Sequence, residues 1–224
     1  MAMHARSFNM SIKKHFDALL ERYPELLIAS NDIEEAFQLL KVSFETGGKL
    51  LVCGNGGSAA DSDHIVGELM KSFSLSRAIC KELQFELTSN FGDQGRYLAT
   101  KLEGALPAIS LNCHNALNSA FSNDVDAELI FAQQVVGYGK EKDVLMGIST
   151  SGNAKNVLSA MIVAKARGMK VIGLTGRDGG RFKEHCDVLI NVGGDCTPMI
   201  QELHLPVYHT LCEMMEYHFF GNAK

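Results

Sequence analysis

The sequence predicts an α/β protein of three layers, in which an open parallel sheet is covered by helices on both faces. Short apolar runs, several of them apolar at every position, alternate with segments that carry the helical period of 3.6 residues. Strands covered on both faces give the first pattern, and helices that connect parallel strands give the second. The chain has 224 residues and shows no internal repeat and no linker rich in Pro or Ser, which favours one domain.

The N-terminal segment, residues 1–48, is predicted to be a helical extension of that domain. Apolar residues recur at helical spacing in 12–20 and again in 33–44, and a Tyr-Pro pair that ends at Pro24 separates the two stretches. The pair Gly47-Gly48 is typical of a helix C-terminus. We therefore expect an antiparallel helical hairpin.

Residues 49–224 are predicted to form the domain that contains the sheet. Its five predicted strands are residues 50–53, 108–111, 144–148, 171–175 and 188–192. The stretch 76–106 fits the alternation of strands and helices least well, because it is amphipathic, then broken by polar residues and glycine, and then helical again. We expect this stretch to be an inserted element.

The composition excludes several classes of function. The 21 Lys and Arg against 26 Asp and Glu give a formal charge of −5, which offers no general attraction to nucleic acid. No apolar stretch approaches the roughly 18 to 20 residues that cross a bilayer, and the start MAMHARSFNM lacks a signal-peptide core. We expect a cytoplasmic protein with no membrane partner. The six cysteines form no Cys-x-x-Cys pair, so neither a disulfide framework nor a four-thiolate zinc site is indicated.

A glycine-rich loop, GNGGS at residues 54–58, follows the first predicted strand and precedes a helix that begins near Ala59. Its glycines let the backbone approach a ligand, while Asn55, Ser58 and the helix N-terminus supply hydrogen-bond donors. Ligands of open parallel sheets collect beyond the carboxyl ends of the strands, which makes this loop a candidate site. Taken alone, the loop fits an ordinary tight turn equally well, and it matches neither G-x-G-x-x-G nor a P-loop.

A second loop, STSGN at residues 149–153, follows the third predicted strand and leads into a helix from about Ala154. Three consecutive hydroxyls at a helix N-terminus can surround a phosphate without any Lys or Arg. The alternative is an ordinary N-cap, which would require only one of the three hydroxyls. We favour the anion site, because an acidic protein that binds a phosphorylated ligand needs such a local arrangement.

Two pairs of polar residues on predicted helices are weak signals when taken separately. His64 and Glu68 lie four residues apart on one helix face, where they would share a metal ion, form an acid–base pair or make a simple surface contact. Gln201 and His209 lie eight residues apart on nearly one face of the last helix. Pro206 lies between them and should bend that helix. Neither pair alone establishes a site.

Several short motifs occur together in this chain. They are the strand–GNGGS–helix loop, the pair Asn123-Asp124, GISTSGN at 147–153, LTGRDGG at 174–180 and IQELH at 200–204. In order and spacing they resemble the motifs of the SIS (sugar isomerase) family, and specifically the phosphoheptose isomerases, over nearly all of residues 49–220. The resemblance implies the flavodoxin-like strand order and assigns residues 49–224 to a sugar-phosphate-binding SIS domain.

The resemblance also implies an activity and an assembly. Phosphoheptose isomerases are homotetrameric aldose–ketose isomerases with active sites at subunit interfaces. They convert sedoheptulose 7-phosphate to D-glycero-D-manno-heptose 7-phosphate, which supplies heptose units for lipopolysaccharide and other surface polysaccharides. Such a reaction requires a base beside the carbonyl carbon and an acid for the enediol oxygen, and a divalent ion can polarise the carbonyl.

The family's functional residues map onto this chain as expectations. Zn²⁺, one ion per subunit, is expected on His64, Glu68, Gln201 and His209, with Glu68 and His209 as the catalytic proton carriers. The expected substrate contacts are Asn55, Gly56, Gly57, Ser58, Glu68, Asn123, Asp124, Ser149, Thr150, Ser151 and Gln201. We expect Glu68 and His209 to meet across a subunit boundary, because the glycine-loop helix and the last helix would lie at different edges of a small subunit.

Two departures from the family pattern bear on the substrate. Ala154 stands where the family commonly has Ser, and the stretch 76–106 is longer than the family's usual connection. Two alternatives stay open: an isomerase of another sugar phosphate, and a non-enzymatic DnaA-binding regulator with the SIS fold. The presence of His209 favours an enzyme.

Overall fold

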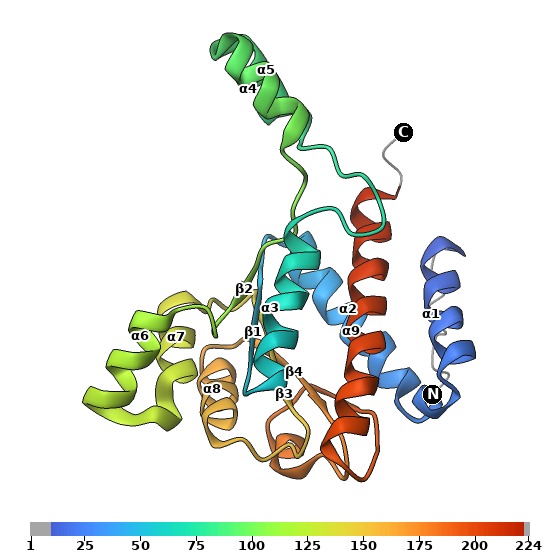
Figure 1. Ribbon diagram of the computed structural model, residues 1–224, viewed down its shortest axis with the longest axis vertical. Coiled ribbons are helices and arrows are strands. Elements are labelled where there is room, and N and C mark those ends of the chain that lie inside the picture. Colours follow the sequence, from blue (N-terminus) through green and yellow to red (C-terminus); the bar gives the residue numbers. More distant parts are fainter. Residues whose placement is uncertain (1–9, 222–224) are drawn as a thin grey trace.

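The computed structural model describes residues 10–221 and contains one open sheet of five parallel strands (Figure 1). The strands are β1 (Leu50–Gly54), β2 (Ala108–Ser110), β3 (Val144–Ser149), β4 (Lys170–Thr175) and β5 (Val188–Asn191). Their order is β2-β1-β3-β4-β5, which is the flavodoxin-like order. Each predicted strand is present, and its ends lie within one residue of the predicted ones.

Helices cover both faces of the sheet, as predicted. The longer ones are α1 (Met10–Arg22), α2 (Ser30–Glu45), α3 (Gly57–Met70), α7 (Ile130–Tyr138), α8 (Lys155–Ala166) and α9 (Thr197–Phe220), and the shorter ones η1 (Pro24–Ala29), α6 (Asn115–Phe121), η2 (Ser122–Asp126), η3 (Ala127–Leu129) and η4 (Gly180–Glu184). Helices α2, α3 and α9 cover one face, with α1 packed on α9, and α7 and α8 cover the other. The fold is therefore a three-layer α/β sandwich.

Strand β1 shows why the sheet needs two helical layers. Leu50 and Val52 contribute to the core under α2, α3 and α9, whereas Leu51 and Cys53 contribute to the core under α7 and α8. All four side chains are at most 1% exposed. Because successive side chains of a strand point to opposite faces, a run that is apolar throughout must be covered on both sides.

The helices predicted within residues 1–48 are present in the described part of the chain and share the main core. Ile33 and Phe37 of α2 and Ile12 of α1 are buried among residues of the sheet and of α9. Both helices pack on α9, and α2 also contacts β5. Residues 1–9 and 222–224 of the two predicted segments lie outside the described residues.

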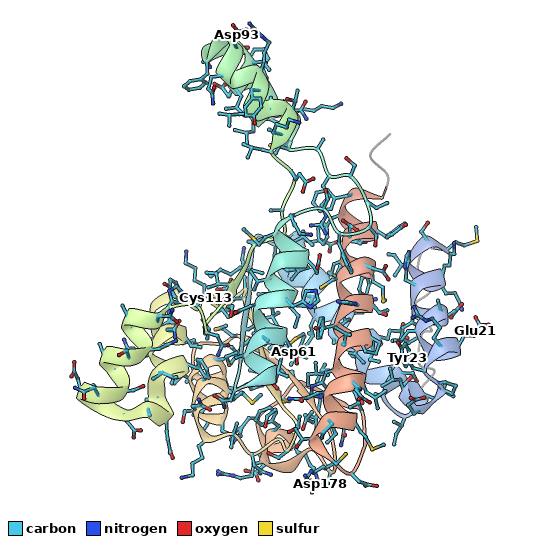
Figure 2. All side chains as sticks on the ribbon, viewed as in Figure 1. Glu21, Tyr23, Asp61, Asp93, Cys113 and Asp178 are labelled. Carbon is cyan, nitrogen blue, oxygen red and sulfur yellow. The ribbon has the colours of Figure 1, made fainter. Side chains whose placement is uncertain are left out.

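The inserted stretch 76–106 forms a helical hairpin that projects from the body of the domain (Figure 1). It consists of α4 (Lys81–Asn90) and α5 (Gly92–Lys101), which pack on each other, and Figure 2 labels Asp93 at its tip. An antiparallel bridge between Ala78 and Glu103 closes its base. We call this hairpin the arm. Its large apolar side chains are well exposed, Phe85 by 67% and Tyr97 by 58%.

The last helix, α9, spans 24 residues and is continuous through Pro206. It lies beside α3, and the two helices run in the same direction from the carboxyl edge of the sheet (Figure 1). Neither α9 nor any other helix within residues 10–221 is long and apolar enough to cross a membrane. The packing of α3 against α9 brings residues of the two helices together in the candidate site.

Candidate active site

Two loops meet at the carboxyl edge of the sheet: residues 54–58, which we call the glycine loop, and residues 149–153, which we call the hydroxyl loop. Gly54 at the end of β1 is in register with Ile148 of β3, so that the loops that follow are neighbours. Asn55 and Asn156 exchange two hydrogen bonds of 2.9 Å, which join the glycine loop to the first turn of α8. Asn112 braces the same loop, because its amide donates to the Gly54 carbonyl at 2.7 Å and accepts from the Gly54 N–H at 3.3 Å. The two loops thus form one continuous surface.

The hydroxyl loop does not serve as an N-cap. Helix α8 has Ala154 at its N-cap position, and no side chain caps it. Ser149 is buried and Ser151 is half-buried, and Ser151 Oγ accepts a 3.3 Å hydrogen bond from the Asn153 N–H. Gly152 has a φ of +63° and packs against the Gly179 carbonyl, which fixes the turn. The capping alternative is therefore not supported, and the anion site stays a prediction.

The glycine loop also contacts the N-terminal part of α9. A Cβ atom at Gly57 would lie 2.5 Å from Gln201 Nε2, so the Gln201 amide packs directly on the loop. This contact requires glycine at position 57, since any other residue would displace the amide. Gln201 therefore joins the glycine loop in the structure.

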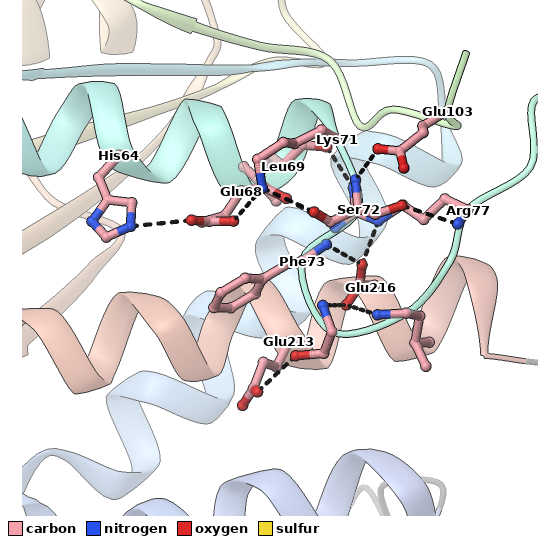
Figure 3. Close-up of polar contacts among 12 residues, drawn as sticks. His64, Glu68, Leu69, Lys71, Ser72, Phe73, Arg77, Glu103, Glu213 and Glu216 are labelled. Atoms are coloured by element: carbon pink, nitrogen blue, oxygen red, sulfur yellow. Dashed lines mark hydrogen bonds and ion pairs between the residues drawn. The ribbon is translucent and has the colours of Figure 1, made fainter. Parts of the chain in front are cut away.

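Two helical turns further along, α3 and α9 bring together a second set of polar side chains. The rings of His64 and His209 lie 4.9 Å apart, centroid to centroid. His64 Nε2 lies 3.1 Å from Glu68 Oε1 (Figure 3). The expectation that Glu68 and His209 lie at different edges of the subunit is wrong, because α3 and α9 pack side by side on the same face of the sheet. The pair is assembled within one chain.

A hydrogen-bond chain orients His64. The Tyr208 hydroxyl donates to Asp61 Oδ1 at 3.2 Å and lies 3.1 Å from His64 Nδ1. Burial, followed by the charge of Asp61, raises the pKa of Tyr208, so the hydroxyl keeps its proton. Since that proton points to Asp61, the Tyr208 oxygen accepts from Nδ1–H, and the lone pair on His64 Nε2 faces Glu68. A proton or a cation is required between Nε2 and the Glu68 carboxylate.

His209 is arranged as a neutral imidazole. Burial, with a smaller effect from His64, lowers its pKa below 6.5, and the carboxylates of Glu68 and Glu213 oppose this shift. Its Nε2 is buried and has no hydrogen-bond partner within residues 10–221. The Phe73 ring lies 5.3 Å from its own ring. Such a histidine can accept a proton or bind a metal ion.

A cavity of about 300 Å³ opens beside His209 between α1 and α9. Its lining includes His15 and Tyr23 from the N-terminal region and Glu202 and Glu213 from α9. The His15 ring nitrogen Nδ1 lies 3.2 Å from Glu213 Oε2. The face of α9 that bears His209 therefore borders a cavity on the α1 side.

The four expected metal ligands do not converge on one point. His64, Glu68 and His209 are neighbours, but Gln201 lies two turns away against the glycine loop. Within residues 10–221, no three side chains of His, Cys, Asp or Glu are close enough together to hold one ion. The metal assignment stays a prediction that rests on the chemistry of the donors.

The expected substrate contacts Asn123 and Asp124 lie in η2 and are exposed. The Asn123 amide donates to Asp124 Oδ1 at 2.8 Å. In the described part of the chain, no hydrogen bond joins either residue to the glycine loop or to the hydroxyl loop. Their role in substrate binding stays a prediction.

Sequence reasoning missed three residues that hold the site together. Asp61 precedes His64 by three positions on α3, and Tyr208 adjoins His209, so their helical spacing was a usable signal. Asn112 directly follows the predicted strand 108–111, at the edge where ligands collect.

Comparisons with known proteins show the family of this chain. The SIS domain model matches residues 14–103 and 98–176. The phosphoheptose isomerase of a Helicobacter pylori strain is 39% identical over 209 residues, which cover 93% of this chain and 95% of that protein. The chain belongs to the phosphoheptose isomerase family of SIS-domain proteins.

Other members of the phosphoheptose isomerase family match over similar lengths. The protein of a Nitratiruptor species is 43% identical over 171 residues, covering 76% of this chain and 78% of its own. The phosphoheptose isomerase structure from Neisseria gonorrhoeae aligns with a TM-score of 0.70 at 32% identity and covers 92% of this chain and 96% of its own. That from Francisella tularensis gives 0.71 at 31% identity, with coverages of 91% and 95%. The SIS fold and its strand order are confirmed.

Proposed function

We propose that this protein is an aldose–ketose isomerase that converts sedoheptulose 7-phosphate to D-glycero-D-manno-heptose 7-phosphate. Membership of the phosphoheptose isomerase family over more than nine-tenths of the chain supports this activity. The observation that carries it is that Glu68 and His209 both adjoin His64, on two neighbouring helices that begin at the carboxyl edge of the sheet. A carboxylate and a neutral imidazole at one point are what proton transfer between neighbouring carbons requires.

The hydroxyl loop would bind the phosphate. Ser149, Thr150 and Ser151 lie at the carboxyl end of β3, directly before α8. Helix N-termini attract anions through their free N–H groups and the positive end of the helix dipole. The glycine loop, which is tied to α8 through Asn55, would lie against the sugar.

Glu68 and His209 would carry the protons of the reaction. One group takes a proton from the hydroxyl-bearing carbon beside the carbonyl while the carbonyl oxygen gains a proton from the other, which gives an enediol. A proton is then added to the former carbonyl carbon, and the neighbouring hydroxyl loses its proton to become the new carbonyl. Because burial keeps the pKa of His209 low, the imidazole is neutral at pH 7 and able to accept a proton. With a proton or a cation between His64 Nε2 and Glu68, the Asp61–Tyr208–His64 chain would hold the Glu68 carboxylate in place through His64.

We also propose one Zn²⁺ per subunit, held by His64, Glu68, Gln201 and His209, which requires Gln201 to leave its place against the glycine loop. The donor set of two imidazole nitrogens, a carboxylate and an amide oxygen suits zinc. The lone pair of His64 Nε2 and the unpartnered Nε2 of His209 support it. When bound, the ion would polarise the substrate carbonyl as a Lewis acid. Elemental analysis of protein purified without chelator, beside His64→Ala, tests the assignment; equal metal content in both would contradict it.

For the assembly we propose a homotetramer with active sites at subunit interfaces. Support comes from the arm, whose Phe85, Phe91 and Tyr97 are 58 to 67% exposed, more apolar surface than such a small hairpin leaves uncovered in a stable fold. We expect light scattering to give about four times the chain mass of 24.4 kDa. A mass equal to one chain would contradict the proposal. We also propose that the protein acts in the cytoplasm, in the synthesis of heptose for surface polysaccharides.

The decisive experiment is turnover of a panel of ketose phosphates in deuterated water. We expect sedoheptulose 7-phosphate to react fastest and its product to carry solvent deuterium at the carbon beside the carbonyl, because an enediol route passes the proton through a base. The Glu68→Gln variant is the control for background exchange. Another ketose phosphate that reacts more than about tenfold faster than sedoheptulose 7-phosphate would overturn the substrate assignment. A product without deuterium would overturn the enediol route.

A further inference from the structure

An ion pair between Arg77 and Glu216 is fully buried, with both side chains 0% exposed. Arg77 lies at the base of the arm, and Glu216 lies on α9, two turns beyond His209. The Arg77 Nε donates to Glu216 Oε1 at 2.6 Å (Figure 3). Burial of such charges costs free energy of folding unless each is fully hydrogen-bonded. The other hydrogen bonds of Arg77 and Glu216 therefore indicate the role of the pair.

Glu216 fixes the loop that joins α3 to the arm, residues 71–76, which we call the joining loop. Its carboxylate accepts three consecutive backbone N–H groups, from Phe73 at 2.8 Å, Ser74 at 2.7 Å and Leu75 at 3.0 Å. The same loop places the Phe73 ring against His209. Glu216 therefore holds both the loop and one wall of the His209 environment.

Arg77 fixes the end of α3. Its Nη1 donates to the Leu69 carbonyl at 2.8 Å and its Nη2 to the Glu68 carbonyl at 2.9 Å. Carbonyls in the last turn of a helix lack partners within the helix, and a guanidinium supplies them. Arg77 is thus bonded to the backbone of Glu68 on one side and, on the other, to the helix that carries His209.

We propose that Arg77 and Glu216 are positioning residues, a clamp that sets the separation of Glu68 from His209. The inference rests on the proposed function of those two groups. A buried ion pair contributes little net stability compared with apolar residues of the same size, so its fixed, multiply bonded geometry is the property that this pair supplies. Displacement of a catalytic group by about 1 Å costs on the order of a hundredfold in rate, which makes such a clamp valuable.

The test compares variants that alter the clamp without leaving one charge buried alone. Arg77→Lys keeps the charge but loses the fork of donors, and the double variant Arg77→Met with Glu216→Gln removes both charges. We expect both to fold and to lose about tenfold or more in kcat, with KM within about threefold of the wild type. KM is spared because the expected phosphate contacts lie on the hydroxyl loop, which the clamp does not touch.

A second ion pair, between the residues that precede β1 and β3, provides the control. Asp143 accepts from the Lys49 ammonium at 2.5 Å and from the backbone N–H groups of Lys49 at 3.0 Å and Lys140 at 2.8 Å. We expect Lys49→Met with Asp143→Asn to lower the melting temperature but to leave kcat unchanged. If the clamp variants lose no more kcat than this control, the positioning role is overturned.

Hydrogen exchange separates failure of the clamp from failure of the proposed function. In the wild type, we expect the amides of Phe73, Ser74 and Leu75 to be protected, and in Arg77→Lys to exchange at least about tenfold faster. Unchanged exchange would overturn the clamp whatever the enzyme does. Absence of turnover by the wild-type protein with every ketose phosphate would overturn the proposed function, while the exchange experiment would still decide whether the clamp exists.

Discussion

The two ends of the candidate site are built in different ways. At the end proposed to bind phosphate, which we call the phosphate end, Ser149, Thr150 and Ser151 are consecutive, and one strand and one helix place them. At the end proposed for proton transfer, which we call the proton-transfer end, Glu68 and His209 are far apart in the sequence and both adjoin His64 only because α9 packs beside α3. The first end depends on local backbone geometry, and the second depends on the docking of one long helix.

The difference predicts how each end fails. Loss of a hydroxyl in the phosphate end removes one hydrogen bond and leaves its neighbours in place. Disturbance of α9 moves His209, Tyr208 and Gln201 together, because all three are on that helix. The proton-transfer end is therefore expected to be more sensitive to changes made at a distance.

The largest effect is expected from the proton carriers themselves. Glu68→Gln and His209→Ala should each lower kcat by about 10² to 10⁴, the usual contribution of a general acid or base. Steady-state kinetics with sedoheptulose 7-phosphate measure this, and circular dichroism with light scattering verifies that the variants are folded and assembled. A loss below tenfold in either variant would remove that residue from the role.

A fall in pH is expected to lower the stability of the protein through a histidine on α9, the helix on which the proton-transfer end depends. His204 is fully buried on this helix, and burial lowers its pKa from 6.5 to about 4. Between these two pH values the unfolded chain binds the proton and the folded one does not, so stability falls as the pH drops from 6.5 to 4, by up to about 3 kcal/mol.

Urea unfolding at pH 7 and at pH 4.5 checks this dependence in the wild type and in His204→Gln. The variant lacks the titrating ring, and we expect it to lose less stability over the same interval. Identical losses in the two proteins would show that other groups cause the acid sensitivity.

Substitutions at the phosphate end are expected to have smaller effects than those at the proton carriers. Ser151→Ala should weaken sugar-phosphate binding by roughly tenfold to a hundredfold, since a hydrogen bond to a charged group contributes about 1.5 to 3 kcal/mol. Isothermal titration measures the affinity. Ser159→Ala is the control, because Ser159 on α8 donates to the Lys155 carbonyl, away from the loop. Equal affinities of the two variants would contradict the phosphate role.

The smallest effect is expected where the two ends touch. In Gly57→Ala the new Cβ would push the flexible Gln201 amide aside, and we expect kcat/KM to fall by about fivefold, or about 1 kcal/mol. Gly67→Ala lies on the same helix with nothing within 4 Å of the new atom. That control should gain about 0.5 to 1 kcal/mol of stability and keep its activity. Loss of activity in both variants would show that α3 itself, not Gln201, is disturbed.

The sequence was informative wherever the signal is local. The short apolar runs located β1 to β5, and the loops at their carboxyl ends located the proposed phosphate end, because strand burial and turn chemistry depend on neighbouring residues. The pairing of α3 with α9 was missed, since no local pattern states which side of the sheet a final helix returns to. Arg77 and Glu216 were missed for a related reason, as a buried charge looks like a surface charge in a sequence.

The bridge between Ala78 and Glu103 has a consequence for how the domain accommodates the arm. Because the two ends of the hairpin leave the body side by side, its removal would require only a short turn, and closure of a short loop costs little entropy. The arm can therefore be lengthened, shortened or replaced as a cassette without changing the order of the strands. Cys80, which is exposed just beyond the bridge, offers a handle for attaching a fluorophore to that cassette once the other exposed cysteines, Cys113 and Cys196, are replaced, since Cys53 and Cys212 are buried with raised thiol pKa values.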